Sequence, residues 1–244
     1  MSKILVIGES CRDIFVYCDA NRLCPDVPVP VLGIRRQTEN EGMAKNVQRN
    51  ILNIIKECDI VTNNNWQEVT KTRYMHEQTN HMFIRIDTDH NIKRIDLNKV
   101  NLNYELIVVS DYNKGFLTEK DIEKICSLHN NVFLDTKKIL GRWADNAKFI
   151  KINNFEYENS KNNLTQNLRN RLIHTKGGDG CIYKDTVYPV KRVEVKDSSG
   201  AGDSFMAGLV CKYLETNNIV ESIKFANKCA EEVVQHKGVT TIVA

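Results

Sequence analysis

The sequence predicts an α/β protein with a mostly parallel central sheet and a second, smaller sheet beside it. In the second half of the chain, short apolar segments alternate with helical segments, the pattern of parallel strands joined by crossover helices. In the first half, strand-like segments flank polar or proline-rich turns, which favours a small separate sheet. With 244 residues, the chain is long enough for one large domain with a small appendage.

The first elements of the main body lie before residue 60. Residues 3–8 form a short apolar run that ends in glycine, which is typical of a buried parallel strand. Residues 42–56 place Val47, Ile51 and Ile54 at helical spacing, so we expect a helix with a basic outer face.

The small sheet is expected from two stretches. Residues 15–17 and 31–34 look like strands on either side of residues 24–30, where three prolines exclude a helix. Residues 70–87 read as two further strands around a polar turn at 77–80.

The remaining elements follow a regular order, and two helices close the chain over the sheet. We expect strands at 106–110, 132–135, 149–152, 171–175 and 181–183, and helices at 118–129, 202–215 and 220–235.

Composition excludes several classes of function. Hydrophobic residues make up 41% of the chain, charged residues 27%, and the net charge is only +3 without a long basic run, so we expect neither nucleic acid nor a membrane as partner. The eight cysteines form no Cys-x-x-Cys pair, which makes a zinc site improbable. The first strand begins near residue 3 with no leader pattern before it, so reduced thiols and a cytoplasmic location are expected.

Residues 197–205 read Asp-Ser-Ser-Gly-Ala-Gly-Asp-Ser-Phe, and the residues after them look helical. Small residues let the backbone approach a ligand, and a helix start offers free N–H groups to an anion. A carboxylate at Asp203 is unfavourable there unless it has a function, such as taking a proton from a hydroxyl that attacks a phosphate. The alternative is close packing at the glycines, with Asp203 as an ordinary first-turn acid.

Polar residues also follow each predicted strand. Ligands of open α/β sheets bind at the carboxyl ends of the strands. The residues expected at this edge are Gly8 and Asp13, residues 110–115, 135–137, 153–156 and 176–180, and finally 197–203. Carboxylates, lysines and glycines in one place form the composition of a phosphate and Mg²⁺ site.

Three of these motifs resemble signatures of the ribokinase (PfkB) carbohydrate kinases. They are Gly200-Ala201-Gly202-Asp203, the glycine-containing stretch 42–47, and Asn153-Asn154-Phe155-Glu156. Within the family, residues 24–31 and 109–118 are similar to the heptose 7-phosphate kinases that form half of bifunctional ADP-heptose synthases. The resemblance runs from residue 3 to residue 243. It implies a ribokinase-like three-layer sandwich as a single domain over residues 1–244, with a β lid at about 14–37 and 70–88.

The resemblance also implies roles for individual residues in the transfer of phosphate from ATP. Asp203 would be the general base, and the backbone N–H groups of Gly200, Ala201 and Gly202 would stabilise the charge that develops. Asn153 and Glu156 would order Mg²⁺ through water, with a monovalent cation as an additional candidate. The residues expected near the nucleotide are Lys176, Gly177, Gly178, Gly180, Asn153 and Ser199.

The acceptor sugar phosphate is assigned to a second group of residues. We expect Asp13, Gly42, Asn46 and Asp111 to contact the sugar, and Lys114 and Lys137 to bind its phosphate as point charges. Each has a plainer alternative. Asp13 can cap a turn, Asn46 can be a buried hydrogen bonder, and Lys114 can be a surface residue; Asn153 can form an Asx turn, and Glu156 can be a solvated first-turn acid.

Two features depart from the family pattern. Glu41-Gly42 stands where two glycines are usual, so we expect the glutamate to crowd or repel an anionic sugar. Only residues 57–69 stand in place of a strand–helix–strand section, which predicts the loss of about one α/β unit at a sheet edge.

The sequence therefore predicts an ATP-dependent kinase of D-glycero-D-manno-heptose 7-phosphate, acting at the anomeric hydroxyl. The alternatives are another sugar or nucleoside kinase of the same fold, or a sugar-binding relative without catalysis. The lid strands also predict a homodimer.

Overall fold

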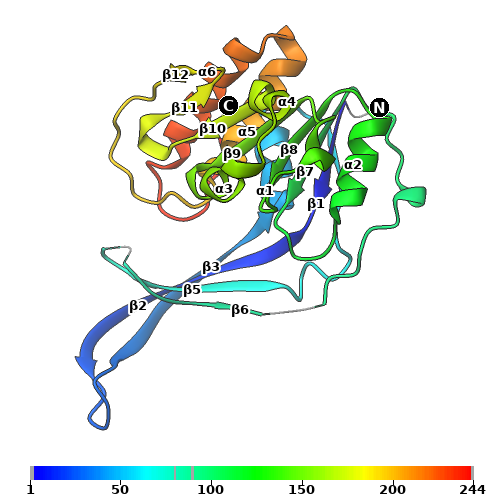
Figure 1. Cartoon of the computed structure of the whole chain (residues 1–244). Coiled ribbons are helices and arrows are strands. Elements are labelled where there is room, and N and C mark those ends of the chain that lie inside the picture. The colour runs from blue at the N-terminus through cyan, green and yellow to red at the C-terminus, as the bar shows by residue number, and fades with distance from the viewer. Residues whose placement is uncertain (1–2, 80, 89–90, 243–244) are drawn as a thin grey trace.

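The computed structural model describes residues 3–79, 81–88 and 91–242, which form a main body and a lid sheet (Figure 1). The body is built on an eight-stranded sheet of order β12-β11-β10-β9-β8-β7-β1-β4. Its strands are β1 (Ile4–Gly8), β4 (Cys58–Val61), β7 (Leu106–Asp111), β8 (Val132–Thr136), β9 (Phe149–Asn153), β10 (Leu172–Thr175), β11 (Cys181–Tyr183) and β12 (Thr186–Tyr188).

The six strands from β4 to β10 are parallel, and β11 and β12 add an antiparallel edge. The sequence-based strands at 3–8, 106–110, 132–135, 149–152, 171–175 and 181–183 are confirmed. The strands β4 and β12 were not predicted. Both are edge strands of three or four residues with little apolar pattern.

Helices cover both faces of this sheet. In the described residues they are α1 (Ala44–Ile54), α2 (Glu119–Leu128), α3 (Asn154–Ser160), α4 (Gln166–Arg171), α5 (Ala201–Thr216) and α6 (Ile219–Val233), with 3-10 turns at Leu97–Lys99, Arg142–Ala144, Lys161–Asn163 and Gly177–Asp179. The four predicted helices at 42–56, 118–129, 202–215 and 220–235 are confirmed within a few residues at each end. None of the described helices is long and apolar enough to cross a bilayer.

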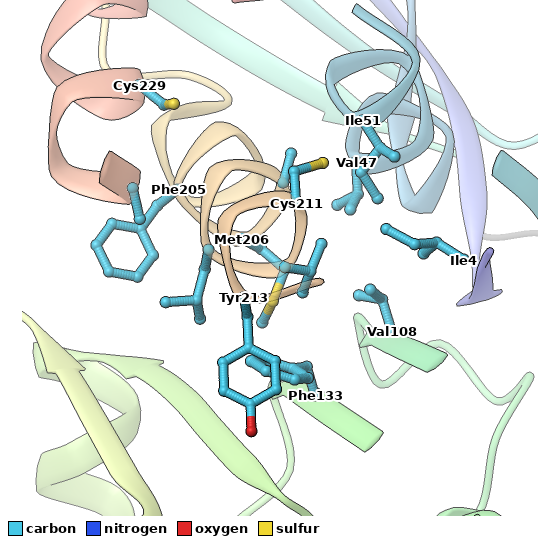
Figure 2. Close-up of a cluster of buried hydrophobic side chains, with 14 of the residues drawn as sticks. Ile4, Val47, Ile51, Val108, Phe133, Phe205, Met206, Cys211, Tyr213 and Cys229 are labelled. Carbon is cyan, nitrogen blue, oxygen red and sulfur yellow. The ribbon is translucent and has the colours of Figure 1, made fainter. Parts of the chain in front are cut away.

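Alternate residues of each strand enter different cores. Ile4 and Val6 pack with α1, α5 and α6 in one cluster, which Figure 2 shows around Met206 and Tyr213. Leu5 of the same strand belongs to a second cluster, which includes residues of α2 and α4. This period of two, with apolar residues in both sets, is what a strand covered on both faces requires. The result is a three-layer sandwich.

The lid sheet has the order β3-β2-β5-β6 and consists of β2 (Ser10–Leu23), β3 (Pro30–Met43), β5 (Thr70–His76) and β6 (Met82–Asp87). Figure 1 shows the β2–β3 hairpin extending from the body, with β5 and β6 beside its base. The strands at 70–87 are confirmed, whereas β2 and β3 are far longer than the predicted 15–17 and 31–34 because ladder pairing carries polar residues on both strands. Asn80, at the end of the predicted turn 77–80, lies outside the described residues.

The segment between α1 and the lid is short. After β4, residues 62–69 form no helix or strand before β5 begins. The predicted loss of an α/β unit therefore maps to this edge, with β4 as the last strand of the sheet.

Candidate active site

The N-terminus of α5 is an uncapped helix start at the centre of the site. Gly200, which precedes the helix, has a φ of 83°, a left-handed conformation that glycine adopts without strain. Side chains cap the starts of α2, α3, α4 and α6, whereas no described side chain caps α5 or α1. The N–H of Ala201 donates to the Ser198 carbonyl at 3.2 Å, and the N–H groups of Gly202 and Asp203 are available to a ligand, as an anion site requires.

Asp203 lies in this first turn and is 6% exposed. Its Oδ2 accepts a hydrogen bond from Asn46 Nδ2 at 2.7 Å, and its Oδ1 accepts one from the Tyr112 hydroxyl at 2.8 Å. Burial raises the pKa of Asp203 above its ordinary value, while the two hydrogen bonds oppose this shift. A buried carboxylate with a raised pKa is a suitable proton acceptor for a hydroxyl.

A buried ion pair lies beside the same helix start. Lys151 Nζ is 2.7 Å from Asp135 Oδ2, and both side chains are at most 5% exposed. A Cβ at Gly202 would lie 3.0 Å from Lys151 Nζ, so the cation is directly beside the glycine turn. It adds positive charge where the helix N-terminus is already positive.

Two carboxylates nearby offer oxygen ligands for Mg²⁺. Asp135 Oδ1 is buried without a hydrogen-bond partner, which is the state of an oxygen that a cation would satisfy. Glu156 and Asn153 form a reciprocal capping box at the start of α3, with Glu156 N to Asn153 Oδ1 at 3.0 Å. Lys137 pairs with Glu156. Burial would lower the pKa of Lys137, but Asp135 and Glu156 together raise it.

These residues fit a Mg²⁺ ion that takes most of its ligands from phosphates and water. The described residues contain no group of three or more His, Cys, Asp or Glu side chains that would hold a metal by themselves. Mg²⁺ bound to nucleotide phosphates usually uses one or two protein carboxylates.

A cavity of about 990 Å³ runs from this corner along α3, α5 and α6. It is lined by Asp203, by the 200–202 turn, by Asn153 and by residues 177–180. A volume of this size accommodates a nucleotide. Further residues of its wall are Lys137, Lys151, Asp135, Tyr112, Phe155, Val193, Val195 and Ser198.

A second group of predicted residues lies on the lid strands and at the start of α1. Asp13 of β2 is buried and forms an ion pair with Arg73 of β5. Gly42 of β3 is paired with Cys11, two residues before Asp13. Lys71, also on β5, holds its ammonium 4.9 Å from the centre of the Tyr112 ring. The structure thus brings Gly42 beside Asp13, and Asn46, four residues after Gly42, bonds Asp203 from the first turn of α1.

Some predicted residues lie elsewhere. The Lys114 side chain is exposed, and Asp111 is buried in an ion pair with Lys138 at 3.0 Å. Lys137 faces Glu156 and the nucleotide cavity. Lys176 and Ser199 are not among the described residues that line this cavity; the N–H of Ser199 donates to Asp197 Oδ1 at 2.8 Å.

Glu41 does not oppose an anionic ligand in the way its sequence position suggested. It pairs with Arg12 across the β2–β3 ladder, so it lies on the face opposite to Cys11 and Asp13. Its carboxylate is 3.0 Å from Lys45 Nζ, one helical turn along the chain. The alternation of side chains along β3 decides which face Glu41 occupies. This alternation was not apparent from the sequence, because the strand was expected to end near residue 34.

Sequence reasoning assigned no role to Lys151, Tyr112, Arg73 or Lys71. Lys151 carries a detectable signal, because a lysine inside the apolar run Phe149–Asn153 must find a buried partner. Arg73 and Lys71 gave no such signal, since charged residues are ordinary on a strand expected to be half exposed.

Comparison with known proteins agrees with this architecture. The model of the pfkB family carbohydrate kinases matches residues 122–244, which include α5 and the 200–203 turn. The chain belongs to this family. It is therefore a carbohydrate kinase, and ATP is the phosphate donor that this family implies.

Curated relatives extend the match to the N-terminal half. The bifunctional protein HldE of Helicobacter acinonychis is 28% identical over 300 residues, covering 98% of this chain, and HldE of Nitratiruptor sp. is 25% identical over 291 residues. The chain spans 64% and 63% of the length of these two relatives. An alignment of 300 positions against 244 residues leaves more than about 50 positions without a counterpart here, in agreement with a shortened edge.

Solved structures share the fold. A ribokinase of Thermotoga maritima superposes with a TM-score of 0.76 at 16% identity, covering 98% of this chain and 95% of that one. A nucleoside kinase of Methanocaldococcus jannaschii superposes with a TM-score of 0.70 at 17% identity, covering 99% and 94%. The ribokinase-like fold predicted from the sequence is confirmed.

Proposed function

We propose that this kinase transfers the γ-phosphate of ATP to a hydroxyl of a phosphorylated sugar, with D-glycero-D-manno-heptose 7-phosphate as the favoured acceptor and its anomeric hydroxyl as the reacting group. The observation that carries the proposal is the position of Asp203. Its buried carboxylate lies at an uncapped helix start, lines the large cavity, and accepts a hydrogen bond from Asn46 of α1.

The proposed reaction uses Asp203 as the general base. The acceptor hydroxyl oxygen attacks the γ-phosphorus, its proton passes to the Asp203 carboxylate, and ADP leaves. The N–H groups of Gly200 and Gly202 in the 200–202 turn and the dipole of α5 stabilise the negative charge that spreads over the transferred phosphoryl group. Lys151 lies beside this turn and adds a fixed positive charge from within the sheet.

Mg²⁺ would be held near Asn153, Glu156 and Asp135. When bound, the ion neutralises phosphate charge and orients the β- and γ-phosphates. Lys137 is poised between Asp135 and Glu156, whose charges raise its pKa, so its ammonium stays protonated and supports the same phosphates.

Two lid cations support an anionic acceptor. Lys71 and Arg73 alternate on β5, so they lie on the same face of the lid as Asp13. Arg73 is occupied by Asp13, whereas Lys71 has no ion-pair partner among the described residues. We therefore assign binding of the acceptor phosphate to Lys71. Lys114 would bind this phosphate only if its exposed side chain moved toward the site.

The lid also supports the proposed homodimer. Its edge strand β6 exposes Met82, Ile84 and Ile86, each about half accessible, and β3 exposes Ile34. Apolar side chains on an unpaired sheet are commonly covered by another chain. Light scattering at micromolar concentration tests this, because a monomer would contradict it.

A panel assay tests the acceptor. Purified protein with Mg-ATP is given heptose 7-phosphate, other sugar phosphates, free sugars and nucleosides, and ADP formation is measured. Strong stimulation by heptose 7-phosphate is expected. Turnover with free sugars or nucleosides but with no phosphorylated acceptor would identify another kinase of this fold. Equal ATP turnover by wild type and Asp203→Asn on every acceptor would contradict the kinase mechanism and favour a non-catalytic relative.

A further inference from the structure

The hydroxyl of Tyr112 is the one phenol in the described residues that contacts the proposed base. Tyr112 follows β7, and its hydroxyl donates to Asp203 Oδ1 at 2.8 Å. Asn46 occupies the other oxygen, Oδ2, at 2.7 Å. An ionised carboxylate has about four lone-pair positions, so these two bonds leave an unused position on each oxygen for the acceptor hydroxyl.

The position of Tyr112 is fixed by a buried carboxylate. Glu9 is 0% exposed and accepts hydrogen bonds from three backbone N–H groups of the loop after β7: Tyr112 at 2.8 Å, Lys114 at 2.9 Å and Phe116 at 3.3 Å. Three hydrogen bonds to one buried carboxylate hold the backbone of this loop in one position relative to Glu9. The hydroxyl of Tyr112 is therefore held against Asp203 by the fold rather than by chance rotation of a surface side chain.

Two cations also lie over the ring of Tyr112. Lys71 of the lid lies 4.9 Å from the ring centre and Lys137 of the main body lies 5.4 Å from it. Cations at these distances are attracted to the face of an aromatic ring. Tyr112 thus contacts the lid, the nucleotide side and the proposed base at once.

We propose that Tyr112 is a positioning residue of the phosphoryl-transfer reaction, whose hydroxyl orients the Asp203 carboxylate and keeps it ionised in its buried site. This rests on the proposed role of Asp203 as base. Burial disfavours the charged carboxylate, and a hydrogen bond donated to it favours the charge. Burial and the nearby Asp203 charge raise the pKa of the Tyr112 phenol well above its ordinary value, so the hydroxyl remains a donor.

Other charged or titratable groups act on Asp203 from the surrounding elements, and they remain in place when the Tyr112 hydroxyl is removed. They are Cys11 on β2, Asp135 on β8, Lys137 after β8, and Lys151 on β9. A change in the pKa of Asp203 that follows removal of the Tyr112 hydroxyl can therefore be attributed to that hydroxyl and not to these groups.

The test is Tyr112→Phe, with Tyr104→Phe as the matched control. Tyr104 also donates to an aspartate, Asp59 Oδ2 at 2.7 Å, but lies before β7 and outside the site. With a saturating acceptor from the panel, Tyr112→Phe is expected to lower kcat by about 10- to 100-fold and to move the acid limb of the rate profile to higher pH. Tyr104→Phe is expected to leave both unchanged.

A double-mutant cycle separates positioning from folding. If Tyr112 acts through Asp203, the change Tyr112→Phe has little further effect on the residual rate of Asp203→Asn. An equal fold-loss in both backgrounds would overturn the inference, and so would a Tyr112→Phe enzyme with an unchanged pH profile.

A titration that needs no turnover keeps this result apart from the proposed function. In protein labelled with ¹³C at aspartate carboxyl carbons, the Asp203 signal is assigned by its loss in Asp203→Asn. The inference expects the Asp203 midpoint to be higher in Tyr112→Phe than in wild type or Tyr104→Phe. Identical midpoints would overturn it, even if an active acceptor is found. A higher midpoint would support it, even if no acceptor in the panel stimulates ATP turnover.

Discussion

Asn46, in the first turn of α1, donates a hydrogen bond of 2.7 Å to Asp203, in the first turn of α5. The two residues are 157 positions apart and both are at most 6% exposed. This bond joins the helix that follows the lid to the helix that carries the proposed base. The proposed sugar side and the proposed phosphate side of the site are therefore coupled directly through the carboxylate.

Asn46→Ala tests this coupling. Loss of the amide donor leaves Oδ2 of Asp203 without its partner, and we expect kcat/KM to fall about tenfold or more. Asn53→Ala is the control on the same helix, since Asn53 bonds Thr241 Oγ1 at 2.8 Å away from the site. Equal activity of the two variants would contradict a role for Asn46. Steady-state kinetics with ATP and an active acceptor measures the difference.

Asp203→Asn should change the pH dependence of stability as well as the rate. Burial raises the pKa of Asp203, so the folded protein binds this proton more tightly than the unfolded chain does. The protein therefore loses stability as the pH rises above the pKa that Asp203 has in the unfolded chain, because the folded state disfavours the ionised carboxylate. We expect the stability of Asp203→Asn relative to wild type to be higher at pH 8 than at pH 4. Urea unfolding at the two pH values measures this, and a gain confined to pH 4 would contradict the sign.

The buried pair Lys151–Asp135 gives a prediction on stability. Lys151→Met leaves the Asp135 carboxylate buried without its cation, and we expect a loss of about 3 kcal/mol or more in unfolding free energy. Adding Asp135→Asn should recover part of this loss, because the uncompensated charge is removed. Urea unfolding of the single and double variants measures both steps; a double variant less stable than Lys151→Met would show that burial of the charge is not the cause.

Gly200→Ala tests the backbone of the turn. At a φ of 83° an alanine is strained, and its Cβ would lie 3.0 Å from Asn46 Nδ2, so we expect a loss of about 1–2 kcal/mol. Gly178→Ala is the matched control for stability, because a Cβ there meets nothing within 4 Å and no left-handed φ is involved. Thermal unfolding should separate the two variants, and equal melting temperatures would refute the conformational argument.

Arg73→Met tests the lid side of the site. The change leaves the buried Asp13 carboxylate without its ion-pair partner and disturbs the surface proposed to meet the acceptor. We expect KM for the acceptor to rise about tenfold or more while KM for ATP changes little. Arg35→Met serves as control, because Arg35 pairs with Asp19 on the exposed outer part of the β2–β3 hairpin. If only KM for ATP rose, Arg73 would support ATP binding, and its assignment to the acceptor side would be contradicted.

The order of the main elements could be predicted because their residues are buried on both faces. The apolar runs of β1 and β7 and the spacing of α1 report such burial directly. The long lid strands could not be bounded in the same way. Their outer residues, such as Arg36 and Glu39 on β3, are exposed and polar, and only pairing with β2 makes them strand.

The site was predictable where a backbone motif defines it and less so where side chains meet across the fold. The 200–203 turn requires small residues in a fixed order, so it is visible in the sequence. Lys114 and Lys138 are both lysines after parallel strands, and nothing local distinguishes the exposed one from the one that binds Asp111. The contacts of Tyr112 and Arg73 depend on loop and lid placement, which periodicity does not encode.

The most direct test of the account follows the phosphoryl group itself. Wild type and Asp203→Asn are mixed with Mg-ATP and heptose 7-phosphate under single-turnover conditions, and ³¹P NMR follows the acceptor. We predict a new phosphate ester at the anomeric position with wild type, formed at least about 1,000-fold faster than with Asp203→Asn. Equal rates of ester formation in the two proteins would contradict the assignment of Asp203 as the base.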